Sequence, residues 1–155
     1  GGIRFGPKIA KQMKHNYEVL FSGDWSTMDE FGNHLEEQRK SDPSPDHYML
    51  ERKAALYIQK TFSGFGPKQS RNFWQSLGLT RYEFVLDSRV LKWLRTIGFP
   101  LPLSSMALGE EEYYCFVSDI LRDWCIQTGV LPCILDAAIF SSYDTDEWPE
   151  DASVW

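Results

Sequence analysis

The stretch FSGFGPKQSRN, residues 62–72, places a lysine directly after a tight turn. Gly64 and Gly66 can both adopt positive φ and let the backbone come close to a partner. Lys68 would open the helix that follows, where a cation opposes the helix dipole and the neutral amine is favoured. This position is poor for stability, but it suits an amine nucleophile.

The backbone of the same turn is suited to an anion. Amides around Gly64, Gly66 and Lys68 would point outward at a helix N-terminus, and this arrangement attracts phosphate. A G-x-G turn taken alone is more often a plain corner between two helices. The glycines by themselves therefore leave both interpretations open.

A carboxylate follows Lys68 at a defined distance along the chain. Asp87 lies nineteen positions after Lys68, at the start of the helix predicted for DSRVLKWLRTI. Asp87 alone is more often an ordinary N-cap. If the two helix N-termini face each other across a cleft, the amine and the carboxylate can act on one substrate. The combination is more specific than either residue.

The elements that must position these residues are helical. Apolar residues recur at helical spacing along most of the chain. We predict that Ser26 or Thr27 caps the second helix, that Asp46 caps the third, and that Gly78 and Gly98 end the fourth and fifth. The predicted helices cover residues 6–21, about 26–39, 46–62, 68–77, 88–97 and 109–129, with a short one after residue 131.

No stretch alternates in the manner of a β-strand, so the predicted class is all-α. Residues 80–86 are predicted to be a connector. We expect one helical domain over residues 1–143, with the helix-hairpin-helix at about 47–78, and an acidic tail over residues 144–155. Trp74 and Trp93 are predicted to be core residues.

Charge is unevenly distributed along the chain. The net charge is −6, but residues 1–108 hold 15 of the 16 basic and 11 of the 22 acidic residues. The segment 52–71 has no acid and contains Arg52, Lys53, Lys60, Lys68 and Arg71. Two interpretations stay open for this segment, a phosphate-binding surface or a solvated helix face.

The three cysteines, Cys115, Cys125 and Cys133, exclude two kinds of site. Their number is odd and no C-x-x-C is present, so a disulfide framework and a four-thiolate cluster do not fit. They are predicted to be small apolar core residues. No apolar run approaches the length of a membrane span, and the first residues lack the apolar region of a signal peptide. We expect an intracellular monomer, in the cytoplasm, nucleoid or nucleus, without membrane contact.

Taken together, the glycine turn, Lys68, the next helix and the aspartate of LDSRVL resemble the helix-hairpin-helix DNA glycosylases. The flanking stretches GIRFGPKIAKQM and ILDAAIF are similar to the archaeal-type, second branch of the 8-oxoguanine DNA glycosylase/AP lyases. The resemblance covers most of residues 1–140 and is strongest over 56–96.

The resemblance implies a base-excision repair enzyme that acts on damaged double-stranded DNA. Such enzymes flip the damaged nucleotide out of the stack. Lys68 would attack the sugar C1′, release an oxidised purine of the 8-oxoguanine type and form a Schiff base, and β-elimination would then nick the strand. Asp87 would orient the amine, move protons and stabilise the cationic sugar.

The resemblance also implies a phosphate clamp at Gly64, Gly66 and Lys68. In the family a monovalent cation, Na⁺ or K⁺, is bound by main-chain carbonyls of the hairpin and strengthens the phosphate contact. The corresponding carbonyls are those of Lys60, Phe62 and Phe65. No organic cofactor and no iron–sulfur cluster are expected.

Two late residues correspond to the family's base pocket. Phe140 aligns with a stacking aromatic and Asp136 with a nearby acid. For Phe140 the alternative is a helix–helix contact, and for Asp136 it is a surface or capping role.

The chain departs from the family pattern in three ways. Phe62 and Ser63 replace the leucine and proline of the hairpin, and no lysine occurs between Phe140 and Trp155, where this branch has one. Family members also begin with further helices, so the chain resembles an N-terminally truncated member. The alternatives are a non-catalytic helix-hairpin-helix module that binds DNA backbone and a protein-interaction domain. The Lys68–Asp87 pair favours the enzyme, because a pure binding module does not need it.

Overall fold

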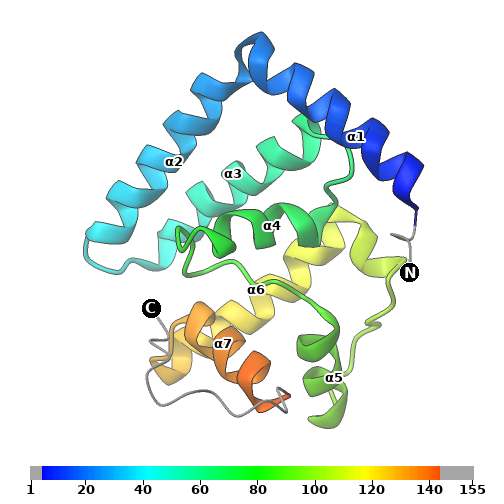
Figure 1. Ribbon diagram of the computed structural model, residues 1–155. Coiled ribbons are helices and arrows are strands. Elements are labelled where there is room, and N and C mark those ends of the chain that lie inside the picture. Colours follow the sequence, from blue (N-terminus) through cyan, green and yellow to red (C-terminus); the bar gives the residue numbers. More distant parts are fainter. Residues whose placement is uncertain (1–4, 144–155) are drawn as a thin grey trace, which may run out of the picture.

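The computed structural model describes residues 5–143. Every regular element in this part of the chain is helical, which confirms the all-α prediction (Figure 1). The predicted acidic tail, residues 144–155, lies outside the described residues. The α-helices are α1 Gly6–Val19, α2 Trp25–Lys40, α3 Tyr48–Thr61, α4 Pro67–Ser76, α5 Ser88–Thr96, α6 Glu111–Thr128 and α7 Pro132–Ser142.

Two apolar clusters hold the helices together. The first joins α2, α3 and α4 around Leu35, Ile58 and Trp74, and Figure 1 shows α3 and α4 side by side. The second joins α5, α6 and α7 around residues such as Leu94 and Leu121, and Trp93 packs against its edge. The core positions predicted for Trp74 and Trp93 are therefore confirmed, with Trp93 only partly buried.

Helices α1 and α2 form a bent arm at one side of the molecule (Figure 1). A π-helical turn, Leu20–Asp24, joins them, and Gly23 provides the bend with φ 130°. No residue of α1 is buried. The predicted cap at Ser26 or Thr27 is wrong, because α2 begins at Trp25 and the Ser26 hydroxyl donates instead to the Gly23 carbonyl.

The predicted cap of α3 is also wrong. Asp46 lies in a short 3-10 turn, Pro45–His47, and α3 begins at Tyr48 without a side-chain cap. Helix ends elsewhere follow the prediction. Gly78 and Gly98 take φ values of 70° and 74° just beyond α4 and α5.

The connector from α4 to α5 has no regular secondary structure and lies against buried polar side chains. The Glu51 carboxylate accepts hydrogen bonds from three successive amides, those of residues 81–83, at 2.8–2.9 Å. The Tyr114 hydroxyl donates to the Phe84 carbonyl and accepts from the Leu86 amide. Burial raises the pKa of Glu51 to about 7, although the three amides act in the opposite direction. These bonds hold the connector where it leads into α5.

The three cysteines are buried or half-buried. Cys125 is buried, Cys115 and Cys133 are half-buried, and all three are free thiols.

No single helix of residues 5–143 is long and apolar enough to cross a membrane. α6 and α7 reach that composition only together, across a bend of 102°.

Candidate functional site at the helical hairpin

The turn between α3 and α4 has one glycine at positive φ and one in an extended conformation. Gly64 takes φ 91°, so the predicted positive φ is confirmed there. Gly66 takes φ −100° and ψ −173°, an extended conformation open to any residue, so the same prediction is wrong at Gly66. Gly66 is the N-cap of α4 and offers no side chain to the first amides of the helix. The N-terminus of α4 therefore lacks the side-chain acceptor that usually satisfies those amides.

Helix α1 holds this turn through a pair of hydrogen bonds. The Asn16 Nδ2 group donates to the Ser63 carbonyl at 3.0 Å, and the Ser63 amide donates to Asn16 Oδ1 at 2.8 Å. The Gln12 side chain lies against Gly64, where an added Cβ would be 3.0 Å from its Nε2 atom. The sequence analysis missed this contact. The available signal was Asn16 itself, since asparagine is a poor residue for a helix interior.

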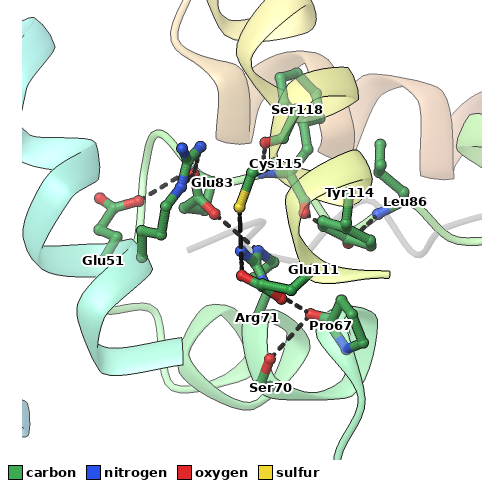
Figure 2. Close-up of polar contacts among 12 residues, drawn as sticks. Glu51, Pro67, Ser70, Arg71, Glu83, Leu86, Glu111, Tyr114, Cys115 and Ser118 are labelled. Carbon is green, nitrogen blue, oxygen red and sulfur yellow. Dashed lines mark hydrogen bonds and ion pairs between the residues drawn. The ribbon is translucent and has the colours of Figure 1, made fainter. Parts of the chain in front are cut away.

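Lys68 occupies the second position of α4, and its side chain is exposed. One turn later, Arg71 is fully buried and has two acidic partners. Its guanidinium bonds to the Glu83 and Glu111 carboxylates at 2.7 Å each and packs over the Tyr114 ring at 4.6 Å (Figure 2). The first turn of α4 is thus attached to the connector and to α6, while the lysine remains in solvent.

The basic residues of segment 52–71 form two groups, arginines paired with acids and exposed lysines. Neither a phosphate-binding surface nor a solvated helix face therefore describes the whole segment. Arg52 bonds to Glu83 and Asp119, and Arg71 bonds to Glu83 and Glu111. Both arginines are therefore structural, because acids from the connector and α6 neutralise them. The exposed cations of the segment are Lys53, Lys60 and Lys68.

Asp87 caps α5, as predicted. Its Oδ1 atom accepts from the Arg89 and Val90 amides at 2.8 and 2.9 Å, and its Oδ2 atom lies 3.6 Å from the Arg89 guanidinium. No hydrogen bond or ion pair joins Asp87 to Lys68, both of which the structure describes. The Tyr114 side chain connects their surroundings instead, because the Arg71 guanidinium packs on its ring and the Leu86 amide donates to its hydroxyl.

Asp136 lies close to Asp87. It is buried, so the surface alternative is wrong, and it lies inside α7, where it does not cap that helix. Its carboxylate accepts a hydrogen bond from the Gln75 side chain. Burial raises the pKa of Asp136 to about 6, the Gln75 bond opposes this rise, and the charge of Asp87 adds to it. The end of α4, the start of α5 and α7 thus meet at these polar groups.

Phe140 lies one helical turn after Asp136 and is 41% exposed. The Arg89 guanidinium lies 4.0 Å from the centroid of its ring. The structure therefore brings Asp87, Asp136 and Phe140 together at the start of α5. It adds Arg89, which the sequence analysis did not single out and for which no sequence signal was available.

The proposed cation ligands are main-chain atoms of the turn. Within residues 5–143 no group of three or more His, Cys, Asp or Glu side chains is placed to hold a metal ion. A cation here would depend on carbonyl oxygens, which suit Na⁺ and K⁺. The Ser63 carbonyl accepts a hydrogen bond from Asn16 and is not one of the ligands that the resemblance implies, which are the carbonyls of Lys60, Phe62 and Phe65.

Comparison of the chain with protein-family models, curated proteins and solved structures finds no match. The site must therefore be judged on its own geometry. Two helix N-termini make up the site. The N-terminus of α4 has no side-chain cap and carries the exposed Lys68. The N-terminus of α5 is capped by Asp87 and lies near Asp136 and Phe140.

Proposed function

We propose that the chain is a DNA glycosylase/AP lyase that removes an oxidised purine from duplex DNA. The observation that supports this best is the placement of Lys68. It is an exposed amine on the first turn of α4, directly after the Gly64 turn and without an acidic partner among residues 5–143. Arg71 attaches this turn to the connector that ends at Asp87.

The proposed reaction takes place in two steps. The Lys68 amine forms a bond to C1′ while the C1′–N bond to the base breaks, and the base leaves with that electron pair and accepts a proton. The bound amine then loses a proton, and its electron pair forms the C=N bond of the Schiff base as the C1′–O4′ bond breaks and O4′ accepts a proton. Removal of a C2′ proton next expels the 3′-phosphate as the C3′–O bond breaks, which nicks the strand.

The structure suggests how Asp87 can take part in this reaction. Its Oδ1 atom is occupied by the cap bonds, whereas Oδ2 has only the Arg89 guanidinium, at 3.6 Å. In the proposal Oδ2 receives and returns the amine proton and stabilises positive charge on the sugar. Because Asp87 does not touch Lys68, the sugar of the flipped nucleotide would lie between them.

The hairpin would hold the DNA backbone beside the reacting sugar. The uncapped amides at the start of α4, together with Gly64, Gly66 and Lys68, would bind one phosphate. A monovalent cation on the carbonyls of Lys60, Phe62 and Phe65 would add positive charge to that contact. A base would stack on the Phe140 face opposite Arg89, near Asp136.

Borohydride trapping tests the proposal. The protein is incubated with duplexes that contain an abasic site or 8-oxoguanine, and the Schiff base is reduced to a stable adduct. Lys68→Gln should abolish the adduct and retain DNA binding, weakened about ten-fold at most by the loss of one charge from the phosphate contact. Lys53→Gln, a change of another exposed helix lysine, is the matched control and should trap like the wild type. Full adduct yield from Lys68→Gln would refute the assignment of the nucleophile.

The absence of a direct Lys68–Asp87 contact favours one alternative, a non-catalytic module that only binds DNA backbone. The same experiment separates the two. Salt-sensitive binding of duplex without any trapped adduct would support the module. A protein-interaction domain would show neither salt-sensitive binding of duplex nor a trapped adduct.

A further inference from the structure

Helix α1 carries positive charge beside the hairpin. Residues 5–17 contain Lys8, Lys11 and Lys14 and no acid. All three side chains are exposed. Lys14 pairs with Glu18 at 3.9 Å, whereas Lys8 and Lys11 have no ion-pair partner within residues 5–143. The charge of these two lysines is therefore not used by the described fold.

The contacts of Asn16 and Gln12 show which face of α1 meets the hairpin. Residues four apart lie one above the other on a helix, so Lys8 shares a row with Gln12 and Asn16. Asn16 bonds to Ser63 and Gln12 lies against Gly64, which places Lys8 next along the row, about 6 Å beyond Gln12 along the helix axis. Figure 1 shows α1 passing alongside the turn between α3 and α4.

Lys14 points in a different direction. It is two residues from Gln12, which corresponds to roughly 200° around the helix axis. Lys14 therefore lies on the opposite face of α1 from the hairpin. The same helix thus offers one lysine beside the turn and one directed away from it.

The position of Lys8 is unfavourable unless an anion is present. It lies in the first turn of α1, where a cation opposes the helix dipole. The N-terminus of α4, which has no side-chain cap and carries Lys68, directly follows the turn between α3 and α4. It adds further positive potential at this turn. A row of phosphates complements this arrangement, because successive phosphates along a strand present one negative charge each.

We propose that α1 and the hairpin form one continuous surface for the backbone of duplex DNA, in which Lys8 binds a phosphate adjacent to the one at Gly64. The inference rests on the proposed DNA-binding function and extends it by a second contact. The paired hydrogen bonds between Asn16 and Ser63 keep the two parts of the surface in register.

The test compares Lys8→Gln with Lys14→Gln by fluorescence anisotropy on an undamaged duplex across a salt series. Each variant loses one exposed lysine from α1, so net charge stays matched, and Lys14→Gln also loses the weak surface pair with Glu18. Lys8→Gln should lower the slope of log affinity against log salt by about 0.9 and weaken binding about five- to ten-fold near 0.1 M salt. Lys14→Gln should leave the slope close to that of the wild type.

A second variant checks the role of the α1–hairpin bonds. Asn16→Ala should reduce the effect of Lys8→Gln, because α1 is then no longer held on the turn. Equal slopes for Lys8→Gln and Lys14→Gln would overturn the inference, even if the wild type binds DNA and gives the borohydride adduct. Binding with the predicted Lys8 effect but without an adduct would support the inference and refute the proposed enzyme. A wild type whose binding does not respond to salt would refute both.

Discussion

The N-termini of α4 and α5 differ in how their first amides are satisfied. At α5 the Asp87 carboxylate accepts from two amides, so the helix completes its own cap. At α4 the N-cap is Gly66, which has no side chain, and an exposed lysine follows. The first amides of α5 thus have a side-chain acceptor within the chain, whereas those of α4 have none. The proposed function uses them accordingly, α4 for the phosphate and the nucleophile and α5 for the carboxylate.

The largest effect is expected at the α5 end, from Asp87→Asn. Asparagine caps helices about as well as aspartate, so the unfolding midpoint should change little. Single-turnover excision should nevertheless slow by a factor on the order of 10² or more, because the amide cannot exchange the amine proton. A wild-type rate for Asp87→Asn, measured beside a matched urea denaturation curve, would make Asp87 only a cap.

A second prediction concerns the buried Asp136 beside that cap. Its pKa is raised from 3.8 to about 6, so the folded state holds a proton that the unfolded state has already released between these values. This contribution to stability is complete below about pH 4 and is lost as pH rises through about 6. The lost stability is up to about 3 kcal/mol on the scale of 1.36 kcal/mol per pKa unit.

Urea unfolding of the wild type and Asp136→Asn at pH 4 and pH 8 measures this contribution. The variant should gain stability relative to the wild type at pH 8. Glu51 also has a raised pKa, but it is present in both proteins and cancels from the difference. A difference that does not change with pH would mean that folding does not raise the pKa of Asp136.

The smallest effect is expected at the α4 end, from Gly66→Val. The extended backbone of Gly66 accepts valine, and an added Cβ would meet only the flexible end of Gln69, at 3.3 Å. The fold should therefore persist while the side chain blocks the close approach of a phosphate. Affinity for damaged and undamaged duplex alike should fall about ten-fold, since a phosphate contact carries no base identity.

Gly109→Val is the control for that experiment, because Gly109 has open space around it and lies outside the hairpin. Unchanged anisotropy curves for Gly66→Val would leave the turn as a corner between helices. They would also remove the distinction between the two helix ends on which the proposed function depends.

The features predicted correctly are mostly local ones. The helical class, the start of α4 just before Lys68, the cap at Asp87 and the ends at Gly78 and Gly98 follow from spacing and from neighbouring residues. The caps predicted at Ser26 and Asp46 failed because a preceding π-helical or 3-10 turn shifted the start of each helix. Neither turn has a sequence signal as clear as that of a glycine C-cap.

Which charged residues are buried and which are exposed could not be predicted from local spacing. Arg71 and Lys68 belong to the same basic segment, yet one is buried between two carboxylates and the other is in solvent. The partners of Arg71 come from positions 12 and 40 residues away. Asp136 is buried for the same kind of reason, because Gln75 and Asp87 reach it from other helices.

The sequence by itself determined the all-α class, the cap at Asp87 and the glycine ends of α4 and α5, because these features depend on residues only a few positions apart along the chain. The tertiary structure alone decided which charges are neutralised, which carboxyl is buried and that α1 lies on the hairpin. Those outcomes depend on contacts between distant segments, and the local spacing of residues carries no information about them.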